Sequence, residues 1–270
     1  MAHSIAALPM YDAPELRAAT DDFWQALADY LRRAGFTDCP DHLTRSENLP
    51  ALWSDPQLLF AQTCGYPLTH GSCGNAELVA TPIYDVADAD GPLYGSAILV
   101  RDDSPIRDLI DARGAIAAIN GYDSNTGMNL FRISLARAGA HERFFSKVVV
   151  TGAHRASIES LLKGDADIAS IDVVTLAHFK TSHQEDYDRL RIVAMTPKTP
   201  GLPYITSGLR DGAALIELRN AAIGFFDQEP RLPCLEILKL KGAVALPRSA
   251  YDVIISLEEE ARALGYPELR

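Results

Sequence analysis

The sequence predicts an α/β protein of two lobes, in which two mixed sheets are flanked by helices. Short apolar runs typical of buried strands alternate with helical patterns along most of the chain. Between residues 101 and 200 this alternation is regular, as in βαβ units. The chain has 270 residues, of which 47% are hydrophobic and 23% charged, and this length suffices for one large domain or two lobes.

The first hundred residues predict a strand, a long helix and three further strands. Residues 4–10 form an apolar run. A helix start follows, with Asp12 as its cap, Pro14 in its first turn and Glu15 completing a capping box. The helix presents an apolar face and ends at Gly35. The three strands that follow are expected at residues 57–65, 77–84 and 93–100.

From residue 101 onward, the pattern predicts alternating strands and helices. Helices are expected at about 105–111, from the polar stretch near 125 to Gly139, at 154–163 and at 173–179. The strands between and after them are expected at 115–120, 147–152, 166–172 and 190–195. A return segment rich in Pro and Gly precedes two closing helices at about 212–227 and 249–264, the second capped by Ser249 and ended by Gly265.

The two blocks of strands and helices predict that the chain crosses between lobes twice. Lobe 1 is expected to contain residues 1–100 and 201–270, and lobe 2 residues 101–200. This topology leaves a cleft between the lobes. Because ligands of open α/β sheets bind at the carboxyl ends of strands, the loops after the strands are the expected binding region.

Charge and hydropathy argue against several classes of partner. The formal net charge is −11, and no run rich in Lys or Arg offsets it, so nucleic acid and anionic membranes are not expected partners. No apolar run reaches the roughly 18 residues that span a bilayer, so membrane insertion is not expected. A small anion is compatible with this charge, because backbone amides and one or two positive groups act at contact distance.

The compartment depends on how the chain begins. The segment MAHSIAALPMYDAPEL lacks the basic region, long apolar stretch and cleavage site of a secretory signal. As the sequence stands we expect a cytoplasmic protein, and a periplasmic one if a signal peptide was removed.

The cysteines and histidines predict neither a disulfide scaffold nor a metal site. The four cysteines are too few and too irregularly spaced for such a scaffold, although Cys64 and Cys73 have the option of pairing in an oxidising compartment. The seven histidines show no zinc spacing beside cysteines. We therefore expect no metal and no cofactor.

A polar helix start is the main candidate site in lobe 2. In INGYDSNTGMNLFRISLARAG, residues 119–139, an apolar run passes into a helical pattern through five small or polar residues: Asp123, Ser124, Asn125, Thr126 and Gly127. The first backbone amides of a helix have no intrahelical partner and attract an anion. The alternative is that Ser124 or Asn125 is an ordinary cap.

Other loops after strands add candidates. His154 starts a helix in TGAHRAS, where its imidazole can bond an oxyanion or can merely cap the helix. Asp172 starts the next helix, and there a cap is favoured over ligand contact. In lobe 1, Tyr11 and Tyr66 can flank a ligand or can pack at the lobe edge.

An enzymatic alternative rests on Cys64. A nucleophilic cysteine needs a base within hydrogen-bond reach, and His70 is near in sequence. Buried inert cysteines are more common than catalytic ones. The sequence has no GxSxG, Walker, HExxH or GxGxxG motif in the required context, which weakens several enzyme classes without excluding catalysis.

Five segments in a fixed order resemble the PhnD-like family of phosphate, phosphite and phosphonate ABC-transporter substrate-binding proteins. They are LPMYDAPEL, LLFAQTCGYP, SAILVRDDSPI, SNTG at a helix start, and GAHRASIESLLKGDADIASID. The resemblance covers about residues 4–205. It implies a type 2 periplasmic-binding-protein fold whose two lobes close over a small oxyanion in an interlobe cleft.

The resemblance also implies roles for individual residues. In that family, a Ser/Thr-rich helix start and a later Gly-x-His segment hold phosphonate oxygens, and aromatic residues of the first lobe flank the ligand. Asn125 departs from the Ser/Thr pattern but keeps a donor. The return segment GLPYITS has no acidic residue to hold a ligand amine, which argues against an aminophosphonate ligand.

The sequence thus predicts a non-catalytic solute-binding protein that clamps a small oxyanion of the phosphate, phosphite or phosphonate type. It would serve an ABC transporter, with a permease as its partner, or act as a ligand sensor. The predicted ligand-binding residues are Tyr11, Cys64, Tyr66, Ser124, Asn125, Thr126, Gly127, His154 and Asp172. The alternative is an enzyme on the same fold that acts in cofactor-precursor biosynthesis through Cys64 or His154.

Overall fold

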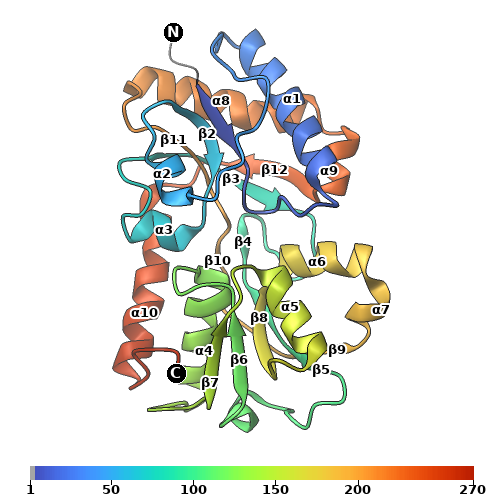
Figure 1. The fold of residues 1–270 in the computed structure, drawn as a ribbon. Coiled ribbons are helices and arrows are strands. Elements are labelled where there is room, and N and C mark those ends of the chain that lie inside the picture. Colours follow the sequence, from blue (N-terminus) through green and yellow to red (C-terminus); the bar gives the residue numbers. More distant parts are fainter. Residues whose placement is uncertain (1–3) are drawn as a thin grey trace. The chain divides into compact units, whose positions relative to one another are not determined.

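The computed structural model describes residues 4–270, and the chain divides into two compact units (Figure 1). Unit 1 comprises Met1–Asp85 and Pro200–Ala250, and unit 2 comprises Val86–Thr199 and Tyr251–Arg270. Each unit contains one five-stranded sheet that mixes parallel and antiparallel pairs. The predicted class, α/β with two mixed sheets flanked by helices, is confirmed.

Unit 1 is built on a sheet in the order β1-β2-β11-β3-β12. Only β1 and β2 run parallel, and each of the other neighbouring pairs is antiparallel. The strands are β1 Ile5–Ala7, β2 Leu58–Gln62, β3 Glu77–Tyr84, β11 Tyr204–Thr206 and β12 Leu240–Val244. The helices are α1 Arg17–Arg33, α2 Leu49–Trp53, α3 Gly65–Thr69, α8 Gly212–Gln228 and α9 Pro233–Ile237.

Aromatic rings fill the core of unit 1. The ring of Phe60 on β2 packs against that of Tyr204 on β11 with centroids 4.7 Å apart. On α1, Phe23 packs edge-on against Phe225 of α8 at 5.8 Å. Burial of each such side chain contributes about 1.5–3 kcal/mol, and the ring contacts add to that. The amphipathic face predicted for α1 is therefore the face that anchors this helix.

Unit 2 is built on a sheet in the order β7-β6-β8-β5-β9. Strands β7, β6 and β8 are parallel, and β5 is antiparallel to β8 and β9. The strands of the Val86–Thr199 part are β4 Leu93–Tyr94, β5 Ser96–Arg101, β6 Ile116–Ile119, β7 Lys147–Val150, β8 Ile168–Asp172 and β9 Leu190–Met195; β10, Thr199–Pro200, leads the chain back to unit 1.

The helices of unit 2 follow the predicted alternation closely. The 3-10 turn Leu109–Ala112 and the π-helical turn Asn125–Asn129 accompany the α-helices, and the 3-10 turn Arg248–Asp252 crosses from unit 1 into unit 2. The α-helices are α4 Leu130–Arg137, α5 His154–Lys163, α6 Val173–Ser182, α7 Gln184–Tyr187 and α10 Val253–Ala263. None of the helices in the described part of the chain has the length and apolar character needed to cross a membrane.

Two predicted helix caps are wrong. Helix α1 begins at Arg17, and its N-cap, Leu16, makes no side-chain cap bond. The Asp12 carboxylate instead accepts bonds of 2.6 and 3.1 Å from the guanidinium of Arg45, a charge-assisted pair that displaces the local cap. Ser249 lies inside the 3-10 turn that precedes α10 rather than at the helix start.

The unit boundaries differ from the sequence-based ranges for physical reasons. Strand β5, which the sequence assigned to lobe 1, pairs with β8 and β9 and thus belongs to unit 2. The segment Tyr251–Arg270 also groups with unit 2, because α10 packs against α4 and the backbone oxygen of Ile254 accepts a bond from Asn129 at 3.1 Å.

Candidate functional site

The parallel strands of unit 2 end in polar loops at one edge of its sheet. Asn120 follows β6, Thr151 follows β7, and Asp172 is the last residue of β8. Because β7, β6 and β8 run parallel, their carboxyl ends lie at the same sheet edge. Each of these loops leads into a helix start, and so this edge gathers the backbone donors of three helices.

The first of these helices starts with a π-helical turn. Ser124 is its N-cap, and the Ser124 hydroxyl accepts a 3.0 Å bond from the backbone N–H of Gly127. The Asn125 amide donates to Thr199 Oγ1 at 2.8 Å and accepts from Asn129 at 3.3 Å. The predicted capping by Ser124 is thus present, and the Asn125 side chain is engaged within the protein. π-Helical turns recur at functional sites.

Thr126, His154 and Asp172 form a connected chain of polar groups. The Thr126 hydroxyl lies 3.0 Å from His154 Nε2, and His154 Nε2 lies 3.4 Å from Asp172 Oδ2. The backbone oxygen of Thr126 accepts bonds from the hydroxyls of Ser96 at 2.9 Å and Ser170 at 2.7 Å. The turn that carries Thr126 is therefore fixed to the two neighbouring strands β5 and β8.

Asp172 also caps α6. Its Oδ1 accepts bonds from the backbone N–H groups of Val174 at 3.0 Å and Thr175 at 2.9 Å. This is the role that the sequence favoured for Asp172. Because a carboxylate only accepts hydrogen bonds, it also orients the N–H of His154 toward itself.

The His154 side chain is half-buried and has one unsatisfied ring nitrogen. Its side chain is 12% exposed. Burial lowers the pKa of His154 below its ordinary value, while the Asp172 carboxylate and the Ser170 backbone oppose that shift. Nδ1 is buried and has no hydrogen-bond partner within residues 4–270. With Nε2 as the N–H of the neutral ring, Nδ1 is an acceptor that a bound molecule can satisfy.

Gly127 and Asn120 are in close contact beside this imidazole. A Cβ atom on Gly127 would lie 2.8 Å from Cγ of Asn120 and 3.0 Å from Cε1 of His154. Only glycine fits, so the glycine is required by close approach rather than by its backbone angles. Oδ1 of Asn120 is buried without a partner in the described chain. Asn120 is not among the residues predicted from the sequence, although its place at a strand end was a signal for it.

The start of α5 offers further donors. Its N-cap, Ala153, makes no side-chain cap bond, so the first backbone N–H groups of α5 are not satisfied by a capping side chain. Gly152 at φ 88° makes the turn before it. Hydroxyls, helix starts and an imidazole are groups suited to a small anion. No cluster of His, Cys, Asp or Glu suited to a metal occurs within residues 4–270.

Three of the predicted ligand-binding residues lie in unit 1, whereas the other six lie in unit 2. Tyr11 is half-buried and packs edge-on against Tyr84 at 5.4 Å. Tyr66 in α3 stacks on His70 with centroids 3.8 Å apart. Cys64 is the half-buried N-cap of α3. Ligand contact by these three residues stays a prediction.

The four cysteines are not joined by disulfides, so Cys64 and Cys73 do not pair. Burial raises the pKa of the Cys73 thiol to about 11, although its contact with the Thr63 hydroxyl at 3.3 Å opposes that shift. Burial likewise raises the pKa of Cys39 to about 11. Both groups are therefore protonated and unreactive at neutral pH.

Two α/β units joined by three crossings, one more than the sequence predicted, with helix starts and hydroxyls gathered at a sheet edge, define a solute-binding protein. The chain belongs to the family of phosphonate periplasmic substrate-binding proteins of ABC transporters, whose family model matches residues 5–251. The resemblance to PhnD-like proteins is thereby confirmed. A comparison with curated protein sequences gave no match.

Solved structures show the same fold at low sequence identity. A binding protein component of an ABC phosphonate transporter, PA3383 from Pseudomonas aeruginosa, has 15% identity and a TM-score of 0.79 over 97% of this chain and 87% of that one. PhnD1 from Prochlorococcus marinus (MIT 9301), in complex with methylphosphonate, has 14% identity and a TM-score of 0.75 over 96% of this chain and 98% of that one. XAC2383 from Xanthomonas citri, bound to chloride ion, has 15% sequence identity and a TM-score of 0.73, over 97% of this chain and 98% of that one. The predicted type 2 periplasmic-binding-protein fold is confirmed.

Proposed function

We propose that unit 2 of this substrate-binding protein holds a small phosphorus oxyanion of the phosphate, phosphite or phosphonate type. One observation carries the proposal: the Thr126 hydroxyl and the His154 imidazole lie 3.0 Å apart, each at the start of a helix. Helix starts favour negative charge by about 0.3–1 kcal/mol each when exposed and more when buried. The methylphosphonate bound to PhnD1 supports the same ligand class.

The proposed contacts are the groups that still have hydrogen-bonding capacity. The Ser124 hydroxyl accepts from Gly127 and so keeps its proton for a ligand oxygen. The Thr126 hydroxyl donates to the ligand when His154 Nε2 carries a proton. Nδ1 of His154 accepts from a P–OH group, or donates once the ring is protonated. Asn125 and Asp172, whose side chains bond within the protein, act in this proposal by positioning Thr199, His154 and α6.

The proposal includes release of the ligand unchanged, to an ABC permease in the periplasm. The alternative of an enzyme that uses Cys64 or His154 makes a different prediction, because it would convert its ligand. Tyr11, Cys64 and Tyr66 are proposed as contributions of unit 1, and their Ala or Ser variants test them one at a time.

Calorimetric titration tests this function. The full chain is titrated with phosphate, phosphite, methylphosphonate, sulfate and acetate, and bound material is recovered for mass spectrometry. We expect binding of at least one phosphorus oxyanion, weaker binding of acetate, and unaltered ligand after hours of incubation. Failure of every oxyanion to bind, or a change in ligand mass, would contradict the proposal.

A further inference from the structure

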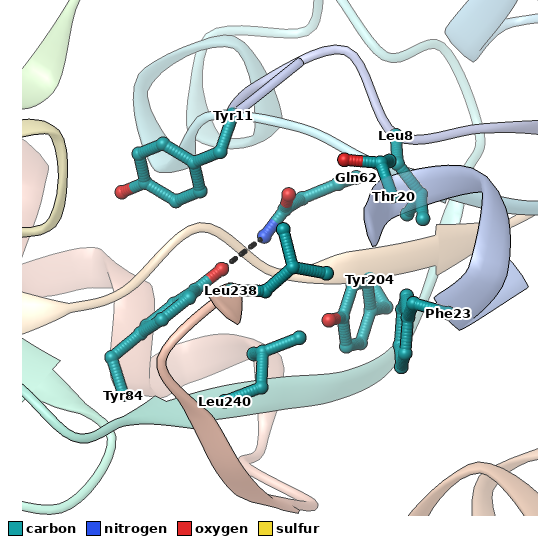
Figure 2. Close-up of a pocket in the computed structure, with 9 residues that line it drawn as sticks. All are labelled: Leu8, Tyr11, Thr20, Phe23, Gln62, Tyr84, Tyr204, Leu238 and Leu240. Atoms are coloured by element: carbon teal, nitrogen blue, oxygen red, sulfur yellow. Dashed lines mark hydrogen bonds between the residues drawn. The ribbon is translucent and has the colours of Figure 1, made fainter. Parts of the chain in front are cut away.

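The pockets of the two units differ in what they can hold. The apolar pocket of unit 1, lined by Phe23, Tyr204 and Leu240 among others, has a volume of about 20 Å³, which is room for one water molecule (Figure 2). Beside strand β7 of unit 2 lies a groove of about 510 Å³, a volume within the range of ligand sites. Residues 145–148 line this β7 groove along the chain, and Tyr122, Arg143, Leu269 and Arg270 complete its lining. All of these residues belong to unit 2.

Strand β7 is an edge strand with an open side (Figure 1). It pairs in parallel with β6, and no other strand within residues 4–270 pairs with it. The Thr151 N–H donates to the Ile119 backbone oxygen at 2.8 Å. Because alternate residues of a strand address the same neighbour, Thr151 and every second residue before it bond β6, whereas the N–H and C=O groups of Val148 and Val150 point to the open side. In the described chain, neither valine has a backbone hydrogen bond outside the strand ladder.

This open edge is also exposed. Val150 is 51% exposed, and Tyr122, in the loop after β6, is 57% exposed. A row of unpaired backbone groups beside apolar surface is a template for another extended chain, and proteins commonly cover such an edge, shorten it or protect it with charge. Main-chain bonds to an edge strand provide affinity, and the side chains beside it provide selectivity. The β7 edge therefore has the geometry for the addition of a strand.

The charge around the β7 groove selects the kind of chain. Arg143, Lys147 and Arg270 line the groove, and no acidic residue lines it. Within residues 4–270, Arg143 and Lys147 form no ion pair. Arg270 pairs with Glu268 at 3.7 Å, where both side chains are mostly exposed. A single lysine on an edge only discourages pairing, whereas three cations around one groove attract negative charge, here on a chain whose net charge is −11.

A second copy of this chain is a poorer occupant of the edge. Pairing of β7 with β7 of another copy would bring the two sets of Arg143 and Lys147 together, and like charges on neighbouring strands are destabilising. An acidic segment avoids this repulsion and places carboxylates beside the two cations. Charge complementarity therefore favours an acidic partner.

We propose that the open edge of β7 binds an extended acidic segment of a partner protein. The segment adds as a strand beside β7, with its backbone bonded to Val148 and Val150 and its carboxylates beside Arg143 and Lys147. This binding goes beyond the oxyanion function and does not depend on it, because none of these four residues is among the proposed oxyanion contacts.

Fluorescence anisotropy with the full chain tests the charge requirement. The probes are a short labelled peptide of alternating Glu and Val and its counterpart of alternating Lys and Val. We expect the Glu peptide to bind and the Lys peptide not to bind. Lys147→Glu should bind the Glu peptide about 3- to 10-fold more weakly, because repulsion replaces an exposed ion pair. The matched control is Lys241→Glu, which reverses an exposed lysine of β12 at the sheet edge of unit 1 and should bind like the wild type.

Amide hydrogen exchange, followed by NMR, tests the addition of a strand. When the Glu peptide binds, the Val148 and Val150 amides should exchange at least 10-fold more slowly, because they gain hydrogen-bond partners. The Val149 amide already faces β6 and should change less than either of them. Melting temperatures of Lys147→Glu and Lys241→Glu equal to that of the wild type show that both variants are folded.

The proposal is overturned if the Glu peptide does not bind, if Lys147→Glu and Lys241→Glu bind it alike, or if exchange at Val148 and Val150 is the same with and without it. A single-stranded oligonucleotide that binds as tightly as the peptide would also overturn it, because a phosphate backbone cannot form the strand ladder. Displacement of the peptide by methylphosphonate would place the peptide in the oxyanion site and would equally contradict binding at β7. Failure of methylphosphonate to bind would instead contradict the oxyanion function alone.

Discussion

The hydroxyl of Thr126 lies 3.0 Å from Nε2 of His154, and this contact joins the π-helical turn after β6 to the start of α5. It places two side chains from different helix starts of unit 2 within reach of one small molecule. The two residues lie far apart in the sequence, so their contact does not arise from local chain geometry. It is a product of parallel pairing of β6 with β7, which sets their loops side by side.

The first prediction concerns the hydroxyl of Thr126. Thr126→Ala should weaken oxyanion binding by about 1.5–3 kcal/mol, as for a hydrogen bond to a charged group, and Thr126→Ser should restore most of the affinity. Calorimetric titration with methylphosphonate measures both. Equal affinity of Thr126→Ala and wild type would place the anion elsewhere. The melting temperature of each variant shows whether a loss is due to unfolding.

The second prediction concerns Gly127. In Gly127→Ala the new methyl group would lie within 3.0 Å of side-chain atoms of Asn120 and His154, so packing strain should lower the free energy of unfolding by about 1–3 kcal/mol. Oxyanion affinity should fall with it, since both neighbours must move. Thermal denaturation and titration give the two values.

Its matched control is Gly212→Ala, at the exposed start of α8, where a Cβ atom meets nothing within 4 Å. That variant should be neutral or slightly stabilising. A double variant, Asn120→Ala with Gly127→Ala, removes the clashing amide and should regain part of the lost stability. Identical melting of Gly127→Ala and wild type would show that the close approach to Asn120 is incorrect.

The third prediction follows from the lowered pKa of His154. Below a pH of about 6.5, the ordinary pKa of histidine, His154 binds a proton in the unfolded chain but stays neutral in the folded chain until the pH is lower. The free energy of unfolding should therefore fall as the pH drops from about 6.5 to the pKa of the folded state, with a slope of at most about 1.4 kcal/mol per pH unit from this group. His154→Gln should lack this part of the slope.

Urea unfolding of both proteins between pH 8 and 5 measures this difference. Parallel curves for His154→Gln and wild type would show that the imidazole titrates as it does in water.

Much of this architecture was accessible from the sequence because its strands are buried apolar runs. β3 and β9 have the bounds that alternation and β-branched content predicted, and α5 begins and ends at the predicted residues, His154 and Lys163. β12 was missed because its segment LKGAV is interrupted by a lysine and a glycine. The short helices α2, α3 and α9 were missed because helices of five residues show no periodicity.

Only those features of the candidate site that depend on neighbouring residues in the sequence could be predicted. Ser124 and Asp172 act as caps that a sequence pattern can indicate. The roles of Asn120 and Asn125 depend on tertiary contacts with Gly127 and Thr199, which no local pattern encodes. The predicted cap at Asp12 is wrong for the same reason, because Asp12 pairs with Arg45, which lies 33 residues away in the sequence.

The fourth prediction concerns Asn129, which ties the π-helical turn to α10. Its fully buried amide donates to the Ile254 backbone oxygen at 3.1 Å, and its Oδ1 accepts from the Arg132 guanidinium at 2.9 Å. Asn129→Ala leaves a buried carbonyl and a buried charged donor without these partners. The free energy of unfolding should fall by about 2–4 kcal/mol, since each loss costs about 1–3 kcal/mol.

The control is Asn220→Ala, which removes an exposed asparagine of α8. Its free energy of unfolding should stay within about 0.5 kcal/mol of that of the wild type. Chemical denaturation gives both values. Asn129 also donates to Asn125 Oδ1 at 3.3 Å, so its loss should loosen the turn that carries Thr126 and weaken oxyanion binding beyond the effect on stability. Unchanged stability together with unchanged affinity in Asn129→Ala would mean that α10 does not support the site, and the turn would then be held by its bonds to Ser96, Ser170 and Thr199.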